Sequence, residues 1–103
     1  MTRETLPCRR PSETVKFQHG GLRHYGTVSH YDDGRVAEIF LDTGKIGSAY
    51  QAMARDLAVA ASLALQHGCP PETLLHALTR DDKGHAAGPL GKLLDMIFGE
   101  ASP

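Results

Sequence analysis

Apolar and β-branched residues gather in three short runs in the first half of the chain. These runs are rich in Val, Thr, Tyr, Phe and Ile, and they predict β-strands over residues 14–18, 22–31 and 35–41. Gly20-Gly21 separates the first two runs and Asp33-Gly34 separates the last two, and both dipeptides tolerate the positive φ of tight hairpin turns. The pattern therefore predicts an antiparallel meander in which successive strands pair.

The second half of the chain changes to helical spacing. Ser48 and Gln51 have the spacing of a capping box, which predicts a helix that begins near residue 48 and stops at Gly68. Nearly every position between 57 and 65 is apolar, so we expect this helix to be central and largely buried. The residues expected to form its core face are Met53, Leu57, Ala60, Ala61 and Ala64.

Two further helices are predicted. Pro71 suits the first turn of one that ends near Arg80, and Gly88-Pro89 opens another that Gly99 closes. The predicted fold class is α+β, a three-stranded antiparallel β-meander followed by about three α-helices packed on one face. We expect an extended arm over residues 1–13, a single domain over 14–99 and a tail over 100–103. The clearest amphipathic pattern lies in the last helix, at Leu90, Leu93, Leu94, Ile97 and Phe98.

The composition is that of an ordinary globular domain. With 103 residues, 41% of them hydrophobic and 22% charged, the chain is expected to fold around one core. A formal net charge of -1 gives no strong attraction to polyanions, so nucleic-acid binding ranks last among the functions considered. Two cysteines and no apolar stretch of bilayer length lead us to expect a reduced, cytoplasmic protein without a membrane partner.

The loop before the first helix is one candidate site. Lys45, Gly47 and Ser48 could bring an ammonium group and helix amides to a phosphate, which suggests a domain that binds or senses a nucleotide phosphate. A P-loop is excluded because Ile39 and Ile46 stand where the Walker pattern needs Gly and Ser or Thr. The alternative is a plain connection whose glycines permit sharp backbone angles.

Histidines and cysteines form no recognisable metal or catalytic set. The spacing of His67, Cys69 and His76 matches no standard zinc pattern, so neither a metal nor a cofactor is expected. No Ser, Cys or Thr stands beside an oriented base, so no catalytic residue is assigned and activity of the chain on its own is not expected. Three histidines near the strands are expected to be solvated sheet residues, namely His19, His24 and His30.

Residues 1–13 combine arginines with prolines, a composition that suits an extended arm lying on another surface. Arg9 and Arg10 are adjacent in this arm. No interleaved aromatic pattern accompanies them, so contact with a protein is preferred over contact with nucleic acid. Both arginines are therefore candidate partner contacts.

Several short motifs, taken in order, resemble those of a known family. They are Leu6-Pro7-x-Arg9-Arg10, Gly20-Gly21, Tyr31-Asp32-Asp33-Gly34-Arg35, Glu38-Ile39-Phe40, Gly47-Ser48-Ala49, Pro71-Glu72-Thr73-Leu74 and Leu94-Asp95-Met96-Ile97-Phe98. From about Leu6 to Phe98 the chain resembles the TSCPD-type domain, the C-terminal accessory domain of cobalamin-dependent (class II) ribonucleotide reductases. The Thr-Ser-Cys-Pro-Asp string that names the family is absent here.

The resemblance implies a stand-alone, non-catalytic accessory or assembly module related to ribonucleotide reductase and deoxyribonucleotide synthesis. In that family the radical-forming cofactor site and the reducing cysteines lie in a large barrel that this sequence lacks, and Cys8 and Cys69 alone do not replace them. The expected partner is a ribonucleotide reductase subunit or another enzyme of nucleotide metabolism. A homodimer is the alternative assembly, because a three-stranded sheet leaves edges exposed.

Overall fold

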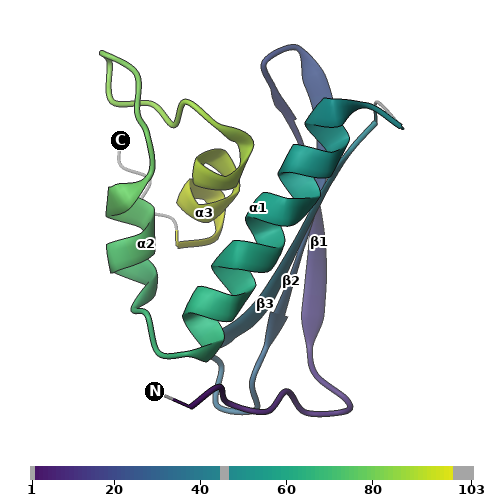
Figure 1. Cartoon of the computed structure of the whole chain (residues 1–103), viewed down its shortest axis with the longest axis vertical. Coiled ribbons are helices and arrows are strands. Elements are labelled where there is room, and N and C mark those ends of the chain that lie inside the picture. The colour runs from purple at the N-terminus through teal and green to yellow at the C-terminus, as the bar shows by residue number, and fades with distance from the viewer. Residues whose placement is uncertain (1, 45–46, 99–103) are drawn as a thin grey trace.

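Three strands and then three helices follow one another along the chain, as the sequence predicts. The computed structural model describes residues 2–44 and 47–98. The strands are β1 (Ser12–His19), β2 (Leu22–His30) and β3 (Val36–Thr43), and the helices are α1 (Ala49–Gln66), α2 (Pro71–Ala77) and α3 (Pro89–Phe98). Figure 1 shows the resulting α+β arrangement, in which α1 runs alongside β3 and α3 lies between α2 and the sheet.

The sheet is an antiparallel meander with the strand order β1-β2-β3. Gly20 and Gly21 adopt φ values of 61° and 77° in the turn between β1 and β2, and Gly34 has a φ of 94° before β3. Residues with a side chain rarely adopt such values, so these glycines define where the chain reverses. The predicted strand pairing is confirmed, and the observed strands differ from the predicted ranges by two residues or fewer at each end.

Helix α1 lies along the outer edge of β3 and hydrogen-bonds to its backbone. The Ile39 N–H donates to Ser62 Oγ at 2.8 Å, and the same hydroxyl donates to the Ile39 carbonyl at 2.9 Å. Gln66 Nε2 donates to the Ala37 carbonyl at 2.9 Å. Two polar side chains of the helix thus satisfy backbone groups that an additional strand would otherwise pair with.

The face of α1 that packs on the sheet is not the predicted one. Met53 and Leu57 were expected in the core, but their side chains are 65% and 38% exposed. The buried positions are mostly small, because a helix that bonds to a strand edge must approach it closely and alanine allows that approach. The expectation of a largely buried helix was therefore wrong. Its buried residues are Gln51, Ala54, Ala58, Ala61, Ser62, Leu65 and Gln66.

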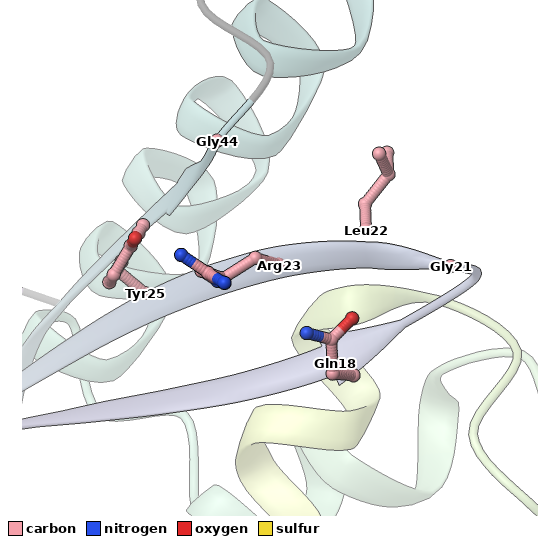
Figure 2. A pocket seen from close by; sticks show the side chains of 6 residues that line it. All are labelled: Gln18, Gly21, Leu22, Arg23, Tyr25 and Gly44. Carbon is pink, nitrogen blue, oxygen red and sulfur yellow. The ribbon is translucent and has the colours of Figure 1, made fainter.

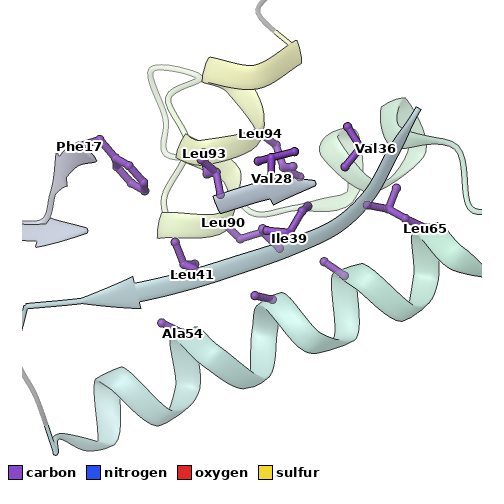
Figure 3. Close-up of a cluster of buried hydrophobic side chains, with 12 residues drawn as sticks. Phe17, Val28, Val36, Ile39, Leu41, Ala54, Leu65, Leu90, Leu93 and Leu94 are labelled. Atoms are coloured by element: carbon purple, nitrogen blue, oxygen red, sulfur yellow. The ribbon is translucent and has the colours of Figure 1, made fainter. Parts of the chain in front are cut away.

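The hydrophobic core lies between the sheet and helices α1 and α3. Leu93 of α3 is fully buried, and its methyl groups occupy the space beside Gly26 of β2. Helix α2 has no fully buried residue and ends at Ala77, before the predicted end near Arg80. The core side chains labelled in Figure 3 come from all three strands, α1 and α3, and they are Phe17, Val28, Val36, Ile39, Leu41, Ala54, Leu65, Leu90, Leu93 and Leu94.

The N-terminal arm lies on its own domain. The Glu4 N–H donates to the Gln66 carbonyl at 2.8 Å, and the Glu4 carboxylate accepts two bonds from the Arg35 guanidinium at 3.0 and 2.9 Å. The His30 N–H donates to the Pro11 carbonyl at 2.9 Å just before β1 begins. The arm therefore joins the end of α1 to the β2–β3 hairpin. The division into arm, domain and tail at the predicted boundaries stays a prediction, and residues 99–103 lie outside the described part.

Candidate functional site

The loop ahead of α1 ends in a capping box, as its sequence predicts. The Gln51 N–H donates to Ser48 Oγ at 3.0 Å, and the Gly47 N–H donates to Gln51 Oε1 at 2.8 Å. Lys45 lies outside the described residues. The phosphate site formed by Lys45, Gly47 and Ser48 therefore stays a prediction, and a phosphate bound there would compete with these capping bonds.

Asp42 anchors the same cap to β3. Its carboxylate accepts from Gln51 Nε2 at 2.8 Å and from the Arg55 guanidinium at 3.1 Å. The hydrogen bond from Arg55, together with that from Gln51, lowers the pKa of Asp42 below its usual value. Asp42 is therefore ionised at neutral pH and its charge is balanced by that of Arg55.

The two arginines predicted as partner contacts have different surroundings. Arg10 is half-buried, and its guanidinium donates to the Pro7 carbonyl at 2.6 Å and to Glu38 Oε1 at 2.9 Å. Arg9 is exposed. Arg10 holds the arm against β3, which leaves Arg9 as the arginine of the pair that a partner could reach. A partner-binding role for either residue stays a prediction.

His24 was predicted to be a solvated sheet residue, but it is fully buried. Its Nδ1–H donates to the Leu22 carbonyl at 3.0 Å, so its Nε2 accepts from the Tyr50 hydroxyl at 2.8 Å. The Phe17 ring stacks on the imidazole with a centroid separation of 5.2 Å. Burial lowers the pKa of His24, which favours the neutral ring assigned in this arrangement. His24 thus joins the sheet to the start of α1.

We expect this histidine to make the folded chain less stable as the pH is lowered. In the unfolded chain His24 takes up a proton near its usual pKa of 6.5, whereas in the folded chain it does so at lower pH. The unfolded state then binds more protons, so the free energy of unfolding decreases as pH falls from about 7.5 to 5.5, by at most about 1.4 kcal/mol per pH unit. Urea titrations at several pH values measure this slope.

Two variants separate His24 from the other histidines in this pH experiment. His24→Gln, whose side chain does not titrate, should lose the slope between pH 7.5 and 5.5, although it is less stable overall. His85→Gln removes an exposed imidazole and should retain the slope. A slope that survives in His24→Gln would show that another group is responsible.

The outward side of α1 carries large apolar side chains, of which Met53 and Leu57 were predicted to face the core. We define the outer apolar face as Met53, Leu57, Val59 and Leu63, which are 65%, 38%, 56% and 40% exposed. Phe40 on the neighbouring strand is also exposed, and the Arg55 guanidinium lies 5.9 Å from its ring centroid. Neighbouring exposed apolar residues of this kind are typical of an interaction surface.

Metal and membrane sites find no support in the described residues. Among residues 2–44 and 47–98, no group of three or more His, Cys, Asp or Glu side chains is placed to hold a metal ion. Cys8 is exposed, Cys69 is half-buried, and both thiols are free. Within the same part of the chain, no helix has the length and apolar character needed to cross a membrane.

The order of strands and helices and the short motifs now define the class of this domain. The TSCPD domain family matches residues 2–99, and the chain belongs to this family. The resemblance seen in the sequence is thereby confirmed. No solved structure matches the chain significantly.

The most informative relatives are vitamin B12-dependent ribonucleotide reductases. The protein from Agrobacterium fabrum is 44% identical over 77 residues, which cover 75% of this chain and 6% of that protein. The protein from Bradyrhizobium diazoefficiens is 36% identical over 107 aligned positions, covering 95% of this chain and 8% of that protein. The one from Streptantibioticus cattleyicolor is 38% identical over 75% of this chain and 13% of its own length. The chain is thus related to a small part of these reductases.

Proposed function

We propose that the chain is a non-catalytic accessory module that docks on a vitamin B12-dependent ribonucleotide reductase through the outer apolar face of α1. The observation that carries the proposal is the exposure of four large apolar side chains on one helix. In the relatives, the region related to this chain is joined to a far larger protein. The cytoplasmic location expected from the sequence is part of the same proposal.

The chemistry of the helix face suits an apolar docking surface. Asp56 is the one charged residue on the exposed outward side between Met53 and Leu63, apart from Arg55, whose charge is paired with Asp42. Met53 with Leu57 and Val59 with Leu63 are each spaced i, i+4, one of the spacings at which helices present apolar anchors to a groove. Burying these side chains removes apolar surface from water, which favours association. In this proposal catalysis stays with the reductase.

Docking is tested with the purified B12-dependent reductase of the same organism as the immobilised partner. We expect saturable binding of the chain in biolayer interferometry, weakened at least about tenfold by the double change Leu57→Ser and Leu63→Ser, because contacts buried at an interface contribute most of its affinity. Both side chains are partly exposed, so a circular-dichroism melt should show a folded variant. Equal affinity of the variant and the parent chain would contradict docking through α1.

Two further measurements test the arm contact and the homodimer. Arg9→Ala tests the predicted arm contact, and unchanged affinity for the reductase would exclude that arginine from the interface. Sedimentation equilibrium of the chain alone tests the homodimer. If the parent chain self-associates and the Leu57/Leu63 variant does not, the face binds a second copy and the reductase proposal is wrong.

A further inference from the structure

The sheet has one covered and one open face near the β1–β2 turn. Residues directly opposite in paired strands point to the same side, and the pairs Lys16↔Tyr25 and Gln18↔Arg23 lie on the side opposite the buried His24. A hollow of about 620 Å³ lies on this open side and is lined by Gln18, Gly21, Leu22, Arg23, Tyr25 and Gly44. Figure 2 shows the Arg23 and Tyr25 side chains coming from the same strand, with Gln18 on the neighbouring one.

The charge in and beside the hollow is positive. Lys16 and Arg23 are exposed, and in the described part of the chain neither forms an ion pair. Asp42 is opposite Tyr25 on this face, and its carboxylate is already paired with Arg55. Two cations without an ion-pair partner in the described part of the chain are therefore diagonal neighbours on this face, although the formal net charge of the chain is -1.

Tyr25 adds an aromatic surface that neighbours both cations. It is opposite Lys16 on β1 and two residues from Arg23 on its own strand, so all three side chains project from the same face. An aromatic ring on an open sheet face can stack with a planar base, and Lys and Arg supply the charge that binds phosphate. Gln18 can both donate and accept hydrogen bonds at the rim.

We propose that this hollow binds a nucleoside phosphate, with its base against Tyr25 and its phosphate at Arg23. The lining includes neither Gly47 nor Ser48 of the predicted loop site, although Gly44 directly precedes that loop. The hollow is shallow and largely open to solvent, so the nucleotide would lie on the sheet face rather than inside a cavity. A single nucleotide is favoured over a long polyanion because the cations are few and the chain as a whole is not basic.

The test is a titration of the isotope-labelled chain with ADP, followed by amide chemical shifts. Adenosine and inorganic pyrophosphate are titrated in parallel. We expect saturable shifts centred on Gln18, Arg23 and Tyr25, and a lower Kd for ADP than for either half-ligand. Absence of shifts with ADP at millimolar concentration overturns the proposal, as do shifts confined to the loop at Gly47 and Ser48.

Single-residue variants test which side chain binds the phosphate and which binds the base. Arg23→Ala should raise the Kd for ADP about tenfold, the usual effect of losing a charge-assisted hydrogen bond. Tyr25→Leu should weaken ADP but leave pyrophosphate unchanged, since it removes the aromatic face alone. Arg9→Ala is the matched control, because it removes the same charge from an exposed site in the arm. An equal effect of Arg9→Ala and Arg23→Ala would mean non-specific charge attraction and would overturn the site.

A titration with a single-stranded oligodeoxynucleotide tests whether the ligand is a free nucleotide or a nucleic-acid strand. Tighter binding than ADP, with the same dependence on Arg23 and Tyr25, would assign the hollow to a nucleic-acid strand and overturn the free nucleotide as its ligand. The inference does not depend on reductase docking. Loss of docking in the Leu57/Leu63 variant leaves ADP binding intact, and Arg23→Ala leaves docking intact, so the two proposals fail separately.

Discussion

Leu93→Ala is expected to lower the free energy of unfolding by about 3 to 4 kcal/mol, the middle of the range for a fully buried leucine. Leu93 is completely buried between α3 and β2, so the variant leaves a cavity that the sheet cannot easily fill. For a domain of this size the loss corresponds to a fall in Tm of roughly 15 °C. Urea denaturation followed by far-ultraviolet circular dichroism measures it.

Gly26 provides the matched partner for this experiment. A Cβ at position 26 would lie 2.6 Å from Leu93 Cδ1 and 2.7 Å from Cδ2, so Gly26→Ala alone should destabilise the fold by about 1 to 3 kcal/mol through overpacking. When Leu93 is also alanine, the same methyl group enters the cavity. The double variant should therefore be more stable than the sum of the two losses predicts. Strict additivity would show that the two residues do not share this space.

Ser62→Ala is expected to lower the free energy of unfolding by about 2 to 3 kcal/mol. The change removes the hydroxyl that accepts from the Ile39 N–H and donates to the Ile39 carbonyl, and it leaves two buried backbone groups unpaired. The penalty exceeds that of an ordinary side-chain hydrogen bond because α1 still covers the strand and keeps water away.

Hydrogen exchange gives this prediction a local readout. The Ile39 amide should lose protection in Ser62→Ala by more than the global change in stability accounts for. Ser12→Ala is the control, since it makes the same chemical change at an exposed position. If the stabilities of Ser62→Ala and Ser12→Ala are alike, the bond between α1 and β3 contributes little to the fold.

Much of the fold could be predicted because local chemistry determines it. Gly20, Gly21 and Gly34 define the hairpins through their positive φ, and Ser48 with Gln51 starts α1 through bonds between near neighbours. The apolar repeat of α3 is confirmed too, with Leu90, Leu93 and Leu94 in the core. In each case the residues that determine the structure lie within a few positions of one another.

The orientation of α1 could not be predicted in the same way, because it depends on residues distant in sequence. An apolar count places Met53 and Leu57 inside, but the helix turns Ser62 and Gln66 toward β3, whose backbone they satisfy. Hydropathy places a serine or a glutamine on the surface and does not show that it can bond to a strand edge. His24 was misjudged for a related reason, since its partner Tyr50 lies 26 positions away.

The candidate sites also divide into one determined by neighbouring residues and one determined by residues distant in sequence. The capping role of Gly47 and Ser48 follows from local spacing, whereas the hollow beside Arg23 and Tyr25 is formed by pairing of β2 with β1 and β3. The alternation of polar and buried positions along β2 was a usable signal, because Arg23 and Tyr25 fall on one side and His24 on the other. Their common surface is defined only once the register of the strands is known.

The attachment of α1 to β3 also limits how copies of this chain could aggregate. On the outer side of β3, Ser62 binds the Ile39 N–H and carbonyl and Gln66 binds the Ala37 carbonyl, whereas β1 pairs on one side only in the described structure. Two copies could join their sheets edge to edge through β1, but that contact would use the free edge of both. Growth would stop at the pair, so edge-to-edge addition cannot continue into a fibre.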